Sequence, residues 1–173
     1  MIAFFGVALA ILGAVQPASA EPVTSLPEKA DPVGALGWVF NVGLKNSNSG
    51  KCALVRGVDN QAPAVQYTCL DFADQRWNLI DDNDDRIFHL VNRNSGKCLL
   101  VQGSANDAPV VQYQCLNFAD QYWTFHWYDD QNGGRYWIQN FNSGKCLLVR
   151  GGSDGTQLVQ TECGSYADQL WSL

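Results

Sequence analysis

The chain has 173 residues, of which 46% are hydrophobic and 16% charged, and its formal net charge is −6. This length suits one domain. An acidic chain lacks the basic face that binding to nucleic acid or heparin requires, because affinity for polyanions comes from counterion release. It also lacks electrostatic attraction to anionic lipid. Nucleic acids and anionic membrane surfaces are therefore excluded as partners.

The N-terminal segment is predicted to be a signal peptide over residues 1–20. Ile2 to Val15 is an unbroken apolar run, and Ala18-Ser19-Ala20 is a small-x-small cleavage site. The run is too short to span a bilayer comfortably. The segment before it lacks a basic residue, so an uncleaved anchor is the alternative. We expect a secreted, extracellular protein that has no membrane association after cleavage.

Residues 21–36 are expected to form a flexible leader, because residues 21–33 contain three prolines and alternating charges. The folded domain is predicted over residues 37–173. It contains one sequence unit written three times, as repeats of about 37–81, 82–129 and 130–173. Each copy has Asn-Ser-Gly-Lys-Cys, a second cysteine 17 residues after the first, and Gln-x-Trp six residues later. The Gln-x-Trp motifs begin at Gln75, Gln121 and Gln169.

Four short strands are expected in each copy, separated by turn residues and with no helical periodicity. The first strands are predicted at 39–42, 86–90 and 135–138, and the second at 54–55, 99–101 and 147–149. The third strands are predicted at 65–67, 110–113 and 158–160, and the fourth at each Gln-x-Trp. Gly50, Gly96 and Gly144 are expected to take positive φ in the Asn-Ser-Gly turns.

Three all-β units predict a β-trefoil. A propeller needs at least four blades, and a solenoid needs a capping repeat that the chain does not show. Closed threefold packing of twelve strands needs neither, and it would bring Trp77, Trp123 and Trp171 together in a shared core.

The six cysteines are expected to form disulfides, because zinc sites use closely spaced pairs and exported chains retain disulfides. The repeat predicts the pairs Cys52–Cys69, Cys98–Cys115 and Cys146–Cys163. The chain-entropy model gives each about 3 kcal/mol.

These motifs resemble the ricin-type lectin domain, which is a β-trefoil, and the resemblance covers Trp38 to Leu173. It implies a sugar-binding fold with one shallow pocket per repeat. The pocket uses an aspartate two residues after the first cysteine, an aromatic two before the second, and the polar pair of Asn-Gln-x-Trp. A carboxylate accepts hydrogen bonds from sugar hydroxyls, and an aromatic face stacks on the ring.

Transferred to this chain, the family pattern is incomplete. The aspartate position holds Leu54, Leu100 and Leu148, and the aromatic position holds Tyr67, Tyr113 and Thr161. The glutamines Gln75, Gln121 and Gln169 remain, and Asp74, Asp120 and Asp168 replace the asparagine before them. Because its aromatic is missing too, the third copy ranks last. Two interpretations are open. In the first, the sugar-binding carboxylate has moved to the new aspartates. In the second, it has been lost, and each new aspartate only forms hydrogen bonds with backbone groups of the turn in which it lies. Loop aspartates form turns more often than they bind ligands, which favours the second interpretation.

Other chemistry finds little support. His89 and His126 have no partner at a catalytic motif spacing, and no paired acids in a glycosidase motif are present. The Asp81–Asp85 run departs from a calcium loop where Gly and Glu are required. We therefore expect neither enzyme activity, nor a cofactor, nor a metal. The predicted function is carbohydrate binding, and the alternative is a protein-interaction trefoil, similar to toxin subunits or protease inhibitors, that has lost sugar binding.

Overall fold

The computed structural model describes residues 38–83, 85–128 and 134–173. The predicted signal peptide and leader lie outside these residues. The first copy contains β1 (Trp38–Gly43), β2 (Lys45–Asn46), β3 (Cys52–Val55), β4 (Ala64–Tyr67) and β5 (Arg76–Asp81). The second contains β6 (Phe88–Asn92), β7 (Cys98–Val101), β8 (Val110–Tyr113) and β9 (Tyr122–Tyr128). The third contains β10 (Arg135–Asn140), β11 (Cys146–Val149), β12 (Leu158–Thr161) and β13 (Leu170–Ser172).

The first strand of the first copy is divided, which gives thirteen strands in place of the expected twelve. Its register against β5 shifts between Val39 and Val42, and Asn41 lies in the left-handed region with φ of 61°. The chain leaves β1 at Gly43 and resumes pairing at Lys45 as β2, now against β13. One chain segment therefore pairs with β5 of its own copy and with β13 of the third copy.

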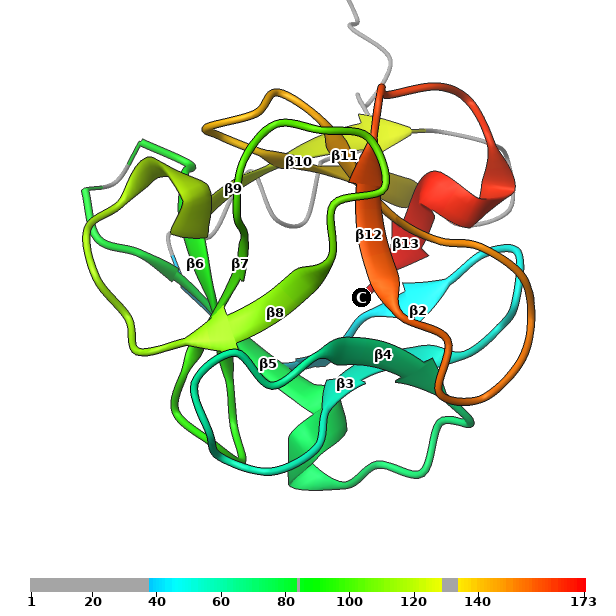
Figure 1. Ribbon diagram of the computed structural model, residues 1–173, viewed down its shortest axis with the longest axis horizontal. Coiled ribbons are helices and arrows are strands. Elements are labelled where there is room, and N and C mark those ends of the chain that lie inside the picture. Colours follow the sequence, from blue (N-terminus) through cyan, green and yellow to red (C-terminus); the bar gives the residue numbers. More distant parts are fainter. Residues whose placement is uncertain (1–37, 84, 129–133) are drawn as a thin grey trace, which may run out of the picture.

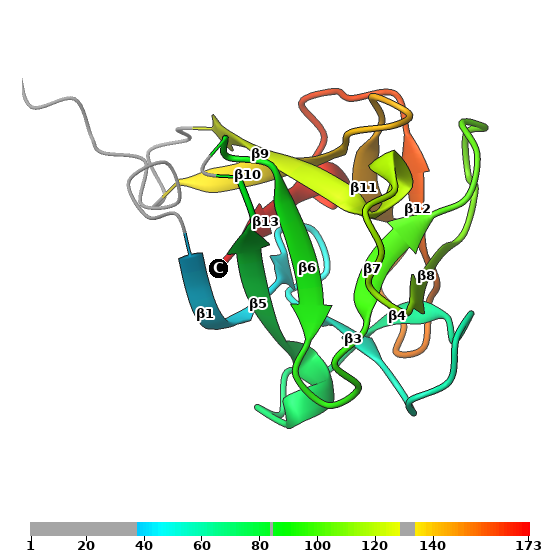
Figure 2. The same ribbon diagram turned by 90° about the vertical axis from the view of Figure 1, so that its left-hand side faces the viewer.

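The strands form a barrel closed at one end by hairpins (Figures 1 and 2). Hydrogen-bonded neighbours follow the order β1-β5-β6-β9-β10-β13-β2, and β2 continues β1, so the order closes on itself. The hairpins β3–β4, β7–β8 and β11–β12 form the cap. They are joined by bridges from Pro63 to Val111, Val65 to Gln157 and Pro109 to Val159. This architecture confirms the predicted β-trefoil.

The threefold tryptophans fill the centre, as the repeat predicts. Trp77, Trp123 and Trp171 are fully buried. Each indole N–H donates to a backbone carbonyl of its own copy, at Ala53, Leu99 or Leu147, over 3.1, 2.9 and 2.9 Å. Buried indoles require such a partner, so the bonds fix each ring in one orientation.

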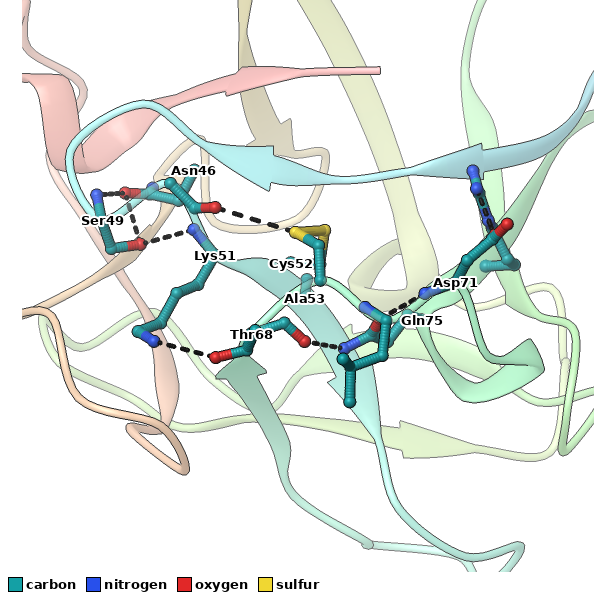
Figure 3. The surroundings of a disulfide bond; sticks show 12 residues. Asn46, Ser49, Lys51, Cys52, Ala53, Thr68, Asp71 and Gln75 are labelled. Carbon is teal, nitrogen blue, oxygen red and sulfur yellow. Dashed lines mark hydrogen bonds and ion pairs between the residues drawn. A yellow bond between two sulfur atoms is a disulfide. The ribbon is translucent and has the colours of Figure 1, made fainter.

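The predicted disulfides and turns are also present. Cys52–Cys69, Cys98–Cys115 and Cys146–Cys163 each join the two cysteines of one copy; Figure 3 shows the first. Gly50, Gly96 and Gly144 have φ of 67, 66 and 67°. The sequence did not reveal a 3-10 turn before each Gln-x-Trp, namely η1 (Ala73–Gln75), η2 (Ala119–Gln121) and η3 (Ala167–Gln169). No helix within the described ranges is long and apolar enough to cross a membrane.

Candidate functional site

The glutamines of Gln-x-Trp shape the loop beside each expected pocket. The Gln75 amide oxygen accepts from the Leu70 backbone N–H at 2.6 Å, and its amide nitrogen donates to the Thr68 carbonyl at 2.8 Å (Figure 3). Gln121 and Gln169 make the equivalent pairs of bonds, at 2.7 and 3.0 Å in both copies. All three side chains are buried. Because both ends of each amide are used within the chain, the glutamines build the pocket wall.

The second copy contains a cavity of about 360 Å³ at the expected position. Tyr113 at the end of β8 and Asp120 in η2 both line it, together with Leu100 from β7. Phe118, which is 61% exposed, forms another wall, and Gln61 reaches in from the first copy. Three predicted site residues, Tyr113, Asp120 and Gln121, therefore line one cavity. Phe118 and Gln61, which the sequence did not suggest, line it too.

Asp120 carries an unused acceptor. Its Oδ1 atom is buried and has no hydrogen-bond partner among the described residues, and the same holds for Asp74 Oδ1. The backbone carbonyl of Asp120, not this oxygen, takes part in the local structure by accepting from the Asn140 side-chain amide at 2.8 Å. A buried acceptor without a donor is costly. Because Oδ1 is inaccessible in both copies, it does not itself face a ligand, and the choice between a moved carboxylate and a turn-forming one stays open.

The third copy also has a cavity, of about 410 Å³, although its aromatic position holds Thr161. Asp168 lines the cavity, and Tyr166, which is 69% exposed, supplies an aromatic ring. Arg150 at the rim pairs with Asp107 of the second copy, Nε to Oδ1, at 2.7 Å. An aromatic residue, Tyr166, therefore lines the third cavity together with Asp168, although Thr161 holds the position of the expected aromatic.

In the first copy the aromatic ring is covered. The Arg56 guanidinium carbon lies 4.5 Å from the centre of the Tyr67 ring, in a cation–π contact. The equivalent residue is Gln102 in the second copy and Arg150 in the third. The Arg56 guanidinium therefore covers the Tyr67 ring, whereas the equivalent Tyr113 lines a cavity.

The sequence contained a signal for the missed aromatics. An aromatic stands two residues before each aspartate, in Phe72-Ala73-Asp74, Phe118-Ala119-Asp120 and Tyr166-Ala167-Asp168, and all three rings are exposed. Two other lining residues come from a neighbouring copy: Gln61 lines the second cavity, and Asn106 lines the third. Their positions depend on how the copies pack together, so no sequence motif indicates them.

The histidines and the acidic run have structural partners. His89 lies between Asp82 and the Leu116 carbonyl, and His126 contacts Thr124 and Gln139. Both Asp81 carboxylate oxygens accept backbone N–H groups of the following turn, from Asn83, Asp85 and Arg86. Among the described residues, no group of three or more His, Cys, Asp or Glu could hold a metal ion.

Comparison with known proteins gives a clear family. Residues 40–171 match the model of the ricin-type beta-trefoil lectin domain. No curated protein matches by sequence. Among solved structures, the designed threefold-symmetric protein ThreeFoil has 30% identity and a TM-score of 0.69, with 79% of this chain and 96% of that chain covered.

Two larger proteins also contain a similar domain. An exo-beta-1,3-galactanase from Clostridium thermocellum has 30% identity and a TM-score of 0.71, and the hemolytic lectin CEL-III has 31% and 0.61. Each comparison covers 77% of this chain and only 29% of the other. The match of the family model over most of the folded region, together with the threefold fold, shows that the chain belongs to the ricin-type β-trefoil lectin domain family.

Proposed function

We propose that this protein is a secreted, non-catalytic lectin that binds glycans in the pockets of its second and third copies. The observation that carries the proposal is the second cavity, which the aromatic residue Tyr113 and the acidic residue Asp120 line together. Membership of a carbohydrate-binding family supports it. Three disulfides suit an extracellular protein.

The second pocket offers the interactions that sugars need. Tyr113 supplies a face for the C–H groups of a pyranose ring, and Phe118 supplies a second apolar wall. The Asp120 side chain lines the pocket and supplies a carboxylate that accepts from a sugar hydroxyl. Leu100, at the position of the family's aspartate, is buried and forms an apolar floor.

The third pocket uses the same aspartate position with a different aromatic. Asp168 and Tyr166 take the parts of Asp120 and the aromatic wall, and the Arg150–Asp107 pair adds polar groups at the rim. Shallow pockets of this kind bind one sugar weakly. Two of them on one molecule gain strength through multivalency when a polysaccharide or cell surface engages both.

A glycan array compares the wild type with Asp120→Ala, Asp168→Ala and the double variant. We expect each single variant to lose part of the signal and the double variant to lose nearly all of it. Asp74→Ala is the matched control, because it makes the same change where Arg56 covers the tyrosine. Signals that survive unchanged in the double variant, with thermal unfolding unaltered, would overturn the proposal.

Protein binding is the second candidate. The three leucines at the family's aspartate positions favour it, because each removes the usual sugar-binding carboxylate and is itself buried. The exposed aromatics Phe72, Phe118 and Tyr166 would then contact a protein partner. An array without signal, combined with specific capture of one secreted protein that Phe118→Ala abolishes, would favour this candidate over the lectin.

A further inference from the structure

A second kind of cavity lies beside the second copy, outside the threefold set of pockets. Its volume is about 580 Å³, larger than either pocket described above. It is lined by residues of the β5–β6 turn, by Asn117, by Tyr122 at the start of β9 and by Phe141. Asn117 lines this cavity, whereas its neighbours Leu116 and Phe118 line the second-copy pocket. One loop therefore forms a wall of both.

Two aromatic side chains provide apolar surface in this cavity. Tyr122 packs against buried His89 with ring centres 4.1 Å apart and planes 25° apart. Tyr122 also lines the cavity. Phe141, which is 54% exposed, lines the same space. A ring held by stacking is a rigid platform that loses little conformational entropy when a ligand binds.

The polar groups of the cavity are held in place as well. Asp82 Oδ2 lies 2.9 Å from His89 Nδ1, and His89 Nε2 lies 3.2 Å from the Leu116 carbonyl. The Tyr122 hydroxyl donates to Asn117 Oδ1 at 3.3 Å. Burial raises the pKa of Tyr122 above its ordinary value, and the charges of Asp82 and Asp85 raise it further. The phenol therefore stays protonated and remains a donor.

The threefold scaffold does not account for this cavity. The backbone N–H of Phe141 donates to the Tyr122 carbonyl at 2.8 Å, which sets the two residues side by side. The same bond joins Arg93 to Arg76 and Ser47 to Leu170 at the two equivalent places. Only the Tyr122–Phe141 pair is aromatic, so its chemistry is particular to this side of the barrel.

We propose that this cavity is an additional saccharide site that takes neutral or amino sugars and rejects anionic ones. The aromatic pair provides stacking surface, and Asn117 and the two aspartates provide acceptors for hydroxyl or ammonium groups. Asp82 and Asp85 both line the cavity, so their charges repel a uronate carboxylate placed in it. The inference does not rest on the pockets of the second and third copies, because it shares no side chain with them.

Amide NMR spectra of the ¹⁵N-labelled protein test the proposal, with glucose, glucosamine and glucuronate and the matching galactose series as probes. We expect the neutral and amino sugars to give saturable shifts at Asn117, Tyr122 and Phe141, and the uronates to give none. Phe141→Ala should weaken binding about threefold or more, the usual scale of an aromatic contact. Asp85→Asn keeps the acceptor for the Ile87 N–H, removes one charge and should admit the uronates.

Phe72→Ala is the control, because Phe72 is an equally exposed aromatic that does not line this cavity. The proposal is overturned if no sugar gives saturable shifts at the three residues, or if Phe141→Ala binds as well as Phe72→Ala. Shifts at Tyr113 and Asp120 report the second-copy pocket in the same spectra. Failure of one site is therefore visible independently of the other.

Discussion

At the scale of single residues, the first two copies differ at the side chain two positions beyond the buried leucine. This residue is Arg56 in the first copy, where it covers Tyr67, and Gln102 in the second, where it lines the pocket beside Tyr113. A guanidinium over a tyrosine occupies the face on which a sugar would stack. We therefore expect the first copy not to bind sugar through Tyr67 while Arg56 covers it.

Exchanging the two residues should exchange the properties of the two copies. Arg56→Gln uncovers the Tyr67 ring, so we expect a gain of sugar binding in the first copy. Gln102→Arg should weaken binding in the second copy, by about threefold to tenfold. Titration of each variant with the best array ligand, followed by amide shifts at Tyr67 and Tyr113, measures both changes. An unaltered first copy in Arg56→Gln would show that the guanidinium does not block it.

At the scale of elements, each hairpin loop fastens to a neighbouring copy. Asp154, in the β11–β12 loop, accepts from Lys51 Nζ at 2.6 Å and from the Thr68 backbone N–H at 2.9 Å. Asn60, in the β3–β4 loop, makes the equivalent backbone contact by accepting from Gln114 N–H at 3.0 Å. The hydrogen bond from Lys51, with help from Thr68, holds the pKa of Asp154 below its usual range.

The ion pair between Asp154 and Lys51 should make the contact between the first and third copies sensitive to low pH. A lowered pKa in the folded state means that the stabilisation is complete above the usual aspartate pKa and is lost as pH falls through the lowered value. Thermal midpoints measured from about pH 5 to about pH 2 should therefore fall less steeply in Asp154→Asn than in the wild type. Asp59→Asn, at another exposed loop position, is the control. Parallel curves for wild type and Asp154→Asn would contradict the assignment.

The elements were largely predictable from sequence, and the site only in part. Strands, disulfides and glycine turns recur at fixed spacing, so three copies supported each assignment. Tyr113 and Asp120 were also found by position. The contact between Arg56 and Tyr67 was not predictable, because it depends on the path of a long side chain. The division of the first strand, and the residues that cross from one copy to the next, depend on packing that no local pattern records.

At the scale of the whole molecule, buried asparagines tie the copies into a ring. The side-chain amides of Asn46, Asn92 and Asn140 donate at 2.8 Å to the backbone carbonyls of Asp168, Asp74 and Asp120. All three asparagines are fully buried, and their amide oxygens accept from the following Asn-Ser turn. Each thus joins the turn of one copy to the 3-10 turn of another.

Replacing any one of these asparagines by alanine should destabilise the protein by about 1 to 3 kcal/mol, because buried backbone groups lose their partners. The three losses should be similar, as the three environments are. Urea unfolding measures them, and Asn48→Ala, an exposed position in the same turn, should change little. A much smaller loss for Asn46→Ala would indicate that the junction of the first and third copies is looser than the other two.

That junction has a consequence for how the protein is made. Each disulfide joins residues 17 apart and can form as soon as its own copy is complete. The partner of Asn46, by contrast, lies 122 residues further along, and β2 must wait for β13. A ribosome delivers the chain in order, so the β2 edge of the first copy has no partner until the third copy has been made. Pairing of β13 with β2 is then the event that turns three tethered units into one folded body.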